Sequence, residues 1–514
     1  MNHVLPMLLI AAASLVFGPA AAQSAEDNVR AAIARIERLN PRIGAVLAID
    51  PTARDQARAL DRMRRARGPL FGMPILLKDN IEAKGPLPTT AGSLALIDNV
   101  TNRDAPVTAA LRAAGAVILG KTNLSEWANI RSNASISGWS AVGGQTRNPH
   151  ALDRNTCGSS SGSGAAVAAG MVDAAIGTET DGSITCPAAI NGIVGLKPTV
   201  GLVSRTHIVP ISHSQDTPGP MTRDVATAAR VLTAIAGSDP ADPATAQADR
   251  RRADYTTALD PAALKGVRIG VLRFATGWSV PVDRLFDAAL ALLRAQGATL
   301  VDIAALKDRE KIGPAENRVL MTELKVDLNA YLATTPAAVK TRTLADVIAF
   351  NTAHAPQEMA LFGQESFLEA QKTRGLADPA YVAARALSLR IAGRDGIDAL
   401  LAANRVTALV APTMPPAWLI DTVNGDQISG GGAGGLAAVA GYPHLTVPMG
   451  AVRGLPVGLS FIGPAWSEAR LIGYGYAYEQ ASRLRVTPSF RDSVETSPEV
   501  APLLLPPDRT VRPS

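Results

Sequence analysis

Two glycine-rich turns with several hydroxyl groups lie between residues 157 and 198. Residues 158–162 read GSSSG, and residues 177–184 read GTETDGSI. Glycine at this density lets the backbone approach a ligand or another backbone closely. A serine in such a turn can act as a nucleophile when a neighbouring base accepts its proton. A tight turn with a helix of small residues would explain the glycines, but it leaves the two separate hydroxyl-rich turns unexplained.

The first turn also matches the pattern of a nucleophile elbow centred on Ser160. An elbow requires a strand that leads into the turn, whereas residues 148–157 are polar and turn-forming. It also requires a late histidine, and neither His354 nor His444 has a distinguishing context. We therefore disfavour Ser160 as a nucleophile.

Two nucleotide-binding patterns match only by letter. Residues 115–122 fit a P-loop, but their middle residues, Ala-Val-Ile-Leu, favour a strand where a P-loop needs a turn. Gly430, Gly432 and Gly435 fit the dinucleotide fingerprint without a buried strand before them. We expect no cofactor, and we interpret residues 424–435 as a flexible loop at the mouth of a site.

The segment 157–198 resembles the amidase signature family. Ser159 and Ser183 are 24 positions apart, which is the family's spacing between its two catalytic serines. Residues 72–80, GMPILLKDN, resemble the family's lysine strand. The likeness covers residues 69–220 and resumes over 434–463. It is strongest to the bacterial peptide-amidase branch, in residues 89–93, 121–127 and 137–139.

The resemblance implies hydrolysis of linear amides through a Ser–Ser–Lys triad and a serine acyl-enzyme. Ser183 would be the nucleophile, Ser159 the proton relay and Lys78 the base. An oxyanion hole would be formed by the backbone amides of Thr180, Asp181, Gly182 and Ser183. The peptide-amidase branch implies a small-molecule or peptide amide substrate, namely a C-terminal carboxamide converted to the acid and ammonia. The alternatives are an aryl- or fatty-acyl amidase, an inactive binding protein of the same fold and the amidase component of a tRNA amidotransferase.

Lys78 must be neutral near pH 7 to act as that base. A free lysine titrates near 10.4, so burial must lower its pKa by about 3 units. Lys78 directly follows the apolar residues 75–77, which supports burial. The structural alternatives are an ion pair between Lys78 and Asp79, and turn capping by the two serines.

Two positions depart from the usual family pattern and agree with the peptide-amidase branch. Asp181 stands where most members have glycine, and Thr185 stands where many have arginine. These departures bear on the substrate rather than on the triad.

The histidines near the turns, His150, His207 and His213, are interpreted as structural, because a lysine-based proton path needs none of them. The chain has no His-x-x-x-His or Cys-x-x-Cys spacing, so we expect no metal. Cys157 and Cys186 stand beside the two turns. They could form a disulfide, but we favour packed thiols.

Short apolar runs predict strands, and periodic segments between them predict helices. This alternation favours a single large α/β/α domain with a mixed, mostly parallel central sheet. Ser24 is expected to cap a first helix that Asn40-Pro41 ends. The runs predict strands at residues 75–77, 116–119, 267–272, 407–411, 445–447 and 457–461, and helices at 107–114, 163–170 and 282–296.

The ends of the chain predict its location. An apolar run over residues 4–17, a Gly-Pro break and three alanines indicate a signal peptide, residues 1–22, that is cleaved after Ala22. The amidase domain would then span residues 23–495, and a proline-rich tail residues 496–514. We therefore expect a periplasmic or secreted protein.

Composition excludes several other classes. Of 514 residues, 47% are hydrophobic, which is enough for a large core and excludes intrinsic disorder. The net charge of +5 is small and no basic stripe stands out, so we expect no nucleic-acid partner. No later stretch is apolar for 18 residues, so we expect no membrane contact after cleavage. Both a monomer and a homodimer remain open.

Overall fold

The computed structural model describes residues 24–63 and 68–505, so the predicted signal peptide and the end of the predicted tail lie outside the described residues. Eleven of the described strands form one sheet in the order β1-β3-β2-β6-β8-β7-β12-β13-β11-β9-β10. Its strands are β1 (Val46–Ile49), β2 (Pro74–Lys78), β3 (Val117–Thr122), β6 (Ala174–Glu179), β7 (Val194–Lys197), β8 (Thr217–Thr222), β9 (Arg268–Leu272), β10 (Thr299–Ile303), β11 (Ala408–Pro412), β12 (His444–Val452) and β13 (Leu455–Ile462). The short strands β4 (Trp139–Ser140) and β5 (Gly144–Gln145) pair separately.

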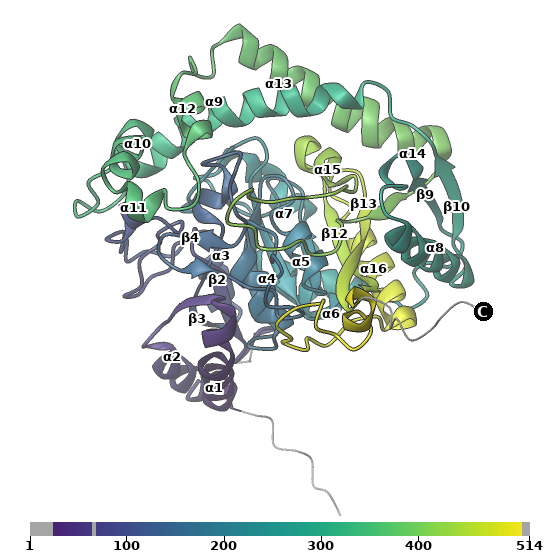
Figure 1. Ribbon diagram of the computed structural model, residues 1–514, viewed down its shortest axis with the longest axis horizontal. Helices are drawn as coiled ribbons and strands as arrows, with labels where there is room; N and C mark the ends of the chain where they lie inside the picture. The colour runs from purple at the N-terminus through teal and green to yellow at the C-terminus, as the bar shows by residue number, and fades with distance from the viewer. Residues whose placement is uncertain (1–23, 64–67, 506–514) are drawn as a thin grey trace, which may run out of the picture.

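Helices cover both faces of this sheet, which confirms the predicted α/β/α fold (Figure 1). Ile75 and Leu77 of β2 face one layer, with α3, α6, α8 and α16, while Leu76 faces the layer with α1, α2, α4 and α5. The α-helices are α1 (Ala25–Ile43), α2 (Ala53–Asp61), α3 (Pro106–Ala113), α4 (Ser161–Ala168), α5 (Thr185–Ile190), α6 (Val225–Ile235), α7 (Ala248–Arg251), α8 (Val280–Ala295), α9 (Ile312–Leu332), α10 (Leu344–Ala353), α11 (Ala355–Glu358), α12 (Glu365–Gln371), α13 (Pro379–Ala392), α14 (Ala399–Asn404), α15 (Gly434–Ala440) and α16 (Glu468–Ser482).

The sheet is mixed, as predicted, but it is not mostly parallel. Four neighbouring pairs are parallel: β2/β3, β2/β6, β9/β11 and β9/β10. The other six pairs are antiparallel and include all of the centre from β6 to β13. Only β12 and β13 among these pairs are joined by a short loop. The others pair strands that are separated by further elements or by a long connection, so the sequence does not mark their direction.

Strand β8 was not among the predicted strands. It contains Pro218 and Pro220, which normally argue against a central strand. Along β8 the full ladder is formed with β6, whereas β7 pairs only with Met221 and Thr222. The prolines therefore lie where β8 has a ladder partner on one side only.

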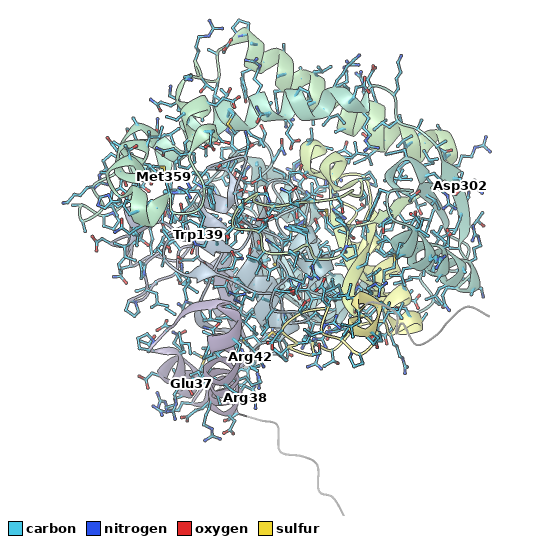
Figure 2. All side chains as sticks on the ribbon, viewed as in Figure 1. Glu37, Arg38, Arg42, Trp139, Asp302 and Met359 are labelled. Atoms are coloured by element: carbon cyan, nitrogen blue, oxygen red, sulfur yellow. A yellow bond between two sulfur atoms is a disulfide. The ribbon has the colours of Figure 1, made fainter. Side chains whose placement is uncertain are left out.

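The first helix, α1, begins as predicted, with the Ser24 side chain accepting the Asp27 amide. It does not end at Pro41, which lies inside the helix, and continues to Ile43 before Gly44 adopts a positive φ. A proline so close to the end removes one hydrogen bond of the last turn. Figure 2 labels Glu37 and Arg38, which are exposed on the outer side of α1, opposite the buried Ile36.

Helices α9 to α13 form an arc over one end of the sheet, at the top of Figure 1. Acidic side chains of helix α9 accept hydrogen bonds from the loop that connects β7 to β8. Among the described helices, none has the length and apolarity that a membrane span requires.

Candidate active site

Lys78, Ser159 and Ser183 come from three segments that meet at one edge of the sheet. Lys78 is the last residue of β2, and the turn to Ser183 starts where β6 ends, at Glu179. Because β2 and β6 are adjacent and parallel, their carboxyl ends share an edge. Ser159 lies just before α4 and brings its Oγ to 2.7 Å from Lys78 Nζ.

The Lys78 amine is completely buried and hydrogen-bonds to uncharged groups. Its Nζ lies 2.8 Å from Thr178 Oγ1 and 3.2 Å from the Thr178 carbonyl oxygen. Desolvation lowers the pKa of Lys78 to about 7, against the opposing attraction of Asp216 and Glu179. A neutral amine has two N–H groups and one lone pair. The two Thr178 oxygens can accept both N–H groups, which leaves the lone pair for the Ser159 hydroxyl.

The predicted alternative, an ion pair between Lys78 and Asp79, is not formed. The Asp79 carboxylate lies 3.4 Å from Lys121 Nζ and accepts the Thr90 amide. Lys121 therefore balances this buried acid, and Lys78 is left without a carboxylate at ion-pair distance among the described residues.

The first turn holds two serines in different roles. The Gly158–Ser159 peptide bond is cis. Ser160 Oγ donates to the Thr178 carbonyl at 3.1 Å and accepts the Thr178 amide at 3.2 Å. Residues 146–160 form turns and isolated bridges but no strand, so the elbow arrangement is absent there. Ser160 ties the turn to the end of β6.

Hydrogen bonds fix the shape of the second turn but leave several of its backbone amides without an acceptor in the described part of the chain. The Glu179 carboxylate accepts the amides of Ile184 and Thr185 at 2.8 and 2.9 Å, and Ser160 donates its amide to the Ser183 carbonyl at 3.2 Å. In contrast, the backbone amides of residues 180–183 donate to no group in the described part of the chain. Several adjacent free N–H groups are what an oxyanion requires.

Comparisons with known proteins agree with this geometry. A family profile described as Amidase matches residues 27–472. A probable amidase of Arabidopsis thaliana is 41% identical over 470 residues, which is 88% of this chain and 86% of that protein. The chain belongs to the amidase signature family. It is thus an amidase, a hydrolase that acts on amides, as the two turns predicted.

Solved structures extend the likeness of this amidase to its whole fold. The crystal structure of native peptide amidase from Stenotrophomonas maltophilia is 54% identical, covers 91% of this chain and 96% of its own, and gives a TM-score of 0.86. Among the curated relatives, a putative amidase of Arthroderma benhamiae is 35% identical over 516 residues, which is 93% of this chain and 82% of that protein.

The two turns of this amidase are joined by a disulfide between Cys157 and Cys186, whose Cα atoms are 6.0 Å apart. The preference for packed thiols was therefore wrong. Cys157 directly precedes the first turn and Cys186 lies in α5, just after the second. Because both turns meet at one sheet edge, the two sulfur atoms are brought within bonding reach.

Two cavities share the second turn as a wall. One, of about 450 Å³, is lined by Thr178 and Thr180, and also by Asn80. The other, of about 310 Å³, is lined by Asp181 and Gly182. Gly431, Gly432, Gly434 and Gly435 of the segment 424–435 line this smaller cavity, and the last two begin α15, so the predicted loop ends earlier than expected.

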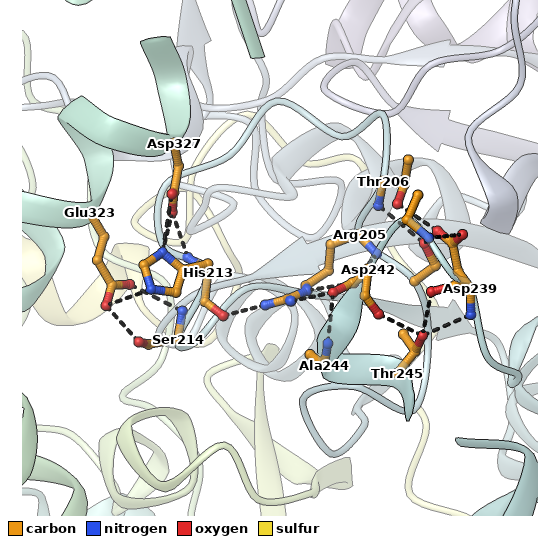
Figure 3. A network of polar contacts seen from close by, with 12 residues as sticks. Arg205, Thr206, His213, Ser214, Asp239, Asp242, Ala244, Thr245, Glu323 and Asp327 are labelled. Atoms are coloured by element: carbon orange, nitrogen blue, oxygen red, sulfur yellow. Dashed lines mark hydrogen bonds and ion pairs between the residues drawn. The ribbon is translucent and has the colours of Figure 1, made fainter. Parts of the chain in front are cut away.

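None of the histidines in the described ranges hydrogen-bonds to Lys78, Ser159 or Ser183. His150 is buried 3.0 Å from the Asn191 carbonyl, and desolvation lowers its pKa to about 4. His213 lies between two carboxylates of α9, with Nδ1 2.9 Å from Asp327 and Nε2 3.4 Å from Glu323 (Figure 3). The hydrogen bond to Asp327 raises the pKa of His213.

His213, Glu323 and Asp327 also form a group close enough to hold a metal ion, which the sequence did not predict. However, both ring nitrogens already face carboxylates. Glu323 also accepts hydrogen bonds from Ser212, Ser214 and Tyr381. We therefore interpret the group as an ion-pair cluster that fastens the β7–β8 connection to α9.

Sequence reasoning missed two residues that organise the site. Thr178 supplies both oxygens that hold Lys78, and Glu179 holds the turn of Ser183. Both stand in the stretch GTETDGSI, but its letters alone do not show which side chain turns toward the lysine.

Proposed function

We propose that this amidase removes the C-terminal carboxamide of peptides and releases the free acid and ammonia. The likeness to peptide amidase supports this substrate class. The observation that carries the proposal is the contact of Lys78 Nζ with Ser159 Oγ at 2.7 Å, next to a turn with free backbone amides.

In the proposed mechanism, neutral Lys78 accepts the proton of Ser159 as Ser159 accepts the proton of Ser183. Ser183 Oγ attacks the carboxamide carbon, and the oxygen of the tetrahedral intermediate is stabilised by the amides of Thr180, Asp181, Gly182 and Ser183. The proton then returns through Ser159 to the amide nitrogen, the C–N bond breaks and ammonia leaves. Water attacks the acyl-enzyme by the same route and restores Ser183.

Thr178 orients the amine of Lys78 for proton transfer from Ser159. With both N–H groups of neutral Lys78 held by Thr178 oxygens, the lone pair can point only toward Ser159. Burial favours the neutral amine and so keeps the base ready near neutral pH.

Ammonia release from amidated peptides and free amino-acid amides, compared with aniline release from anilides, tests the proposal. We expect peptide amides to be preferred, Ser183→Ala to abolish turnover and Ser160→Ala to retain most of it. An inactive Ser160→Ala together with an active Ser183→Ala would support the elbow arrangement instead. A preference for anilides or fatty amides would assign the enzyme to another substrate class of the family.

We also propose that the protein acts in the periplasm or is secreted, through the predicted signal peptide of residues 1–22. The disulfide between Cys157 and Cys186 supports this, because disulfides persist in oxidising compartments. Expression of the full chain, followed by fractionation and N-terminal sequencing, tests it. A mature protein that begins at Gln23 is the expected result, and an uncut protein in the cytoplasm would contradict it.

A further inference from the structure

The side chain of Asp181 lines the smaller cavity and has no hydrogen-bond or ion-pair partner there among the described residues. Asp181 is exposed, whereas Thr180 and Ser183 beside it are buried. Its carboxyl forms no hydrogen bond or ion pair with another residue of the described ranges. The two oxygens lie 3.5 and 3.8 Å from the place that a Cβ on Gly435 would occupy, so glycine at that position leaves the carboxyl uncovered.

The other acids around the turn are already satisfied. Glu179 accepts two backbone amides. Asp216 accepts the hydroxyl of Thr180 at 2.6 Å and two amides of its own loop. Glu316 of α9 accepts the Gln215 amide group at 2.8 Å. Asp181 is thus the acid of this group that remains available to a ligand.

The surroundings of Asp181 are short of positive charge. Glu316 and Glu179 repel the negative charge of Asp181. Lys197 is the cation that opposes this, but it is buried and its Nζ donates to the Pro198 carbonyl. A ligand group with an N–H or a positive charge would supply what the protein does not.

A second polar atom in the same cavity also lacks a partner. His444 is 1% exposed, and its Nε2 lies 2.7 Å from Ser460 Oγ. Its Nδ1 has no partner in the described part of the chain and faces Gly434 on the cavity wall. Desolvation lowers the pKa of His444 to about 3, so the ring is neutral. The cavity therefore contains two unpaired polar groups beside the free turn amides, which indicates a polar ligand.

We propose that Asp181 binds the α-nitrogen of the residue whose carboxamide is cleaved. This inference rests on the proposed function. Asp181 is two residues before Ser183, and its own amide is among those that would hold the carbonyl oxygen. One carbon atom separates the α-nitrogen from that carbonyl, so a carboxyl beside the oxyanion amides can reach it. A peptide N–H and an amino-acid ammonium both donate to a carboxylate, whereas a simple acyl amide offers no donor there.

Three primary amides that share a benzyl group on the α-carbon test this inference: N-acetyl-L-phenylalaninamide, L-phenylalaninamide and 3-phenylpropanamide. On the α-carbon they carry a neutral N–H, an ammonium and no nitrogen, respectively. We expect the wild type to prefer the first two over the third by roughly 10- to 100-fold in kcat/KM, the usual effect of one hydrogen bond to a charged group. Asp181→Ala should remove this preference, mainly through KM.

Asp181→Asn keeps an acceptor and should lose more activity toward the ammonium substrate than toward the N-acetyl substrate. Asp327→Asn, which changes an acid of the other cavity, is the matched control and should leave the ratios unchanged. Equal losses on all three amides would overturn the inference, because Asp181 would then support the turn. An unchanged ratio in Asp181→Ala would overturn it as well.

Failure of the proposed function has a different signature, namely a wild type that releases no ammonia from any peptide amide. Calorimetric binding of N-acetyl-L-phenylalaninamide and 3-phenylpropanamide to Ser183→Ala, with and without Asp181→Ala, tests the contact independently of turnover. Tighter binding of the N-acetyl compound that disappears with Asp181→Ala supports the inference. Equal binding of both compounds overturns it.

Discussion

Replacing Lys78 with methionine tests whether this buried amine is neutral in the folded protein. Burial lowers the pKa of Lys78 from 10.5 to about 7. Between these values the unfolded chain holds a proton that the folded chain has released. The free energy of unfolding therefore rises with pH across that window, and the cost of burying the ammonium is greatest below about pH 7.

The size of this effect follows from 1.36 kcal/mol per pKa unit. Between about pH 6.5 and about pH 9, the stability of the wild type relative to Lys78→Met should rise by about 2.5 kcal/mol. Lys197, also buried, has a pKa lowered to about 8 by desolvation. The same comparison with Lys197→Met should therefore give a smaller rise, about 1.5 kcal/mol.

Urea unfolding of the three proteins at both pH values measures these differences. In parallel, kcat/KM of the wild type should fall as the pH drops below about 7, because Lys78 becomes protonated and can no longer accept a proton. Lys78→Met should lose several orders of magnitude in kcat at every pH. A stability difference that stays constant with pH, together with a flat rate profile, would show that Lys78 is not the titrating base.

Three further changes test how the site is built. Thr178→Val removes one of the two acceptors of Lys78 and should lower kcat by roughly 10- to 100-fold with little change in KM, which steady-state kinetics will show. Gly162→Ala places a Cβ at 2.2 Å from the Ala45 carbonyl oxygen and 2.6 Å from that of Asn123, so it should destabilise the protein by at least about 1–3 kcal/mol in urea unfolding; unchanged stability would mean that this packing relaxes freely. The double change Cys157→Ser with Cys186→Ser opens a loop of 29 residues and should cost about 3–4 kcal/mol, seen as a lower Tm that reducing agent no longer affects.

The family could be predicted from the sequence, and Lys78, Ser159 and Ser183 could be selected as candidates, because these signals are local. The two turns and the lysine strand are short stretches whose glycines, serines and spacing are visible in one chain. The predicted strands at residues 75–77 and 116–119 are continuous apolar runs, and such runs mark strands buried on both faces. The burial of Lys78 followed from the same reasoning, because it ends one of these runs.

Tertiary structure alone decided which segments meet. The pairing of Cys157 with Cys186, the antiparallel centre of the sheet and the strand with Pro218 all depend on neighbours far away in the chain. The same holds for the contact of Thr178 with Lys78 and for the position of the Asp181 carboxyl in the wall of the smaller cavity. A sequence shows which groups are present and how far apart they stand along the chain. Hydrogen bonds, bonding distances and desolvation arise only when distant segments pack together, so the chemistry of the site was decided by the fold.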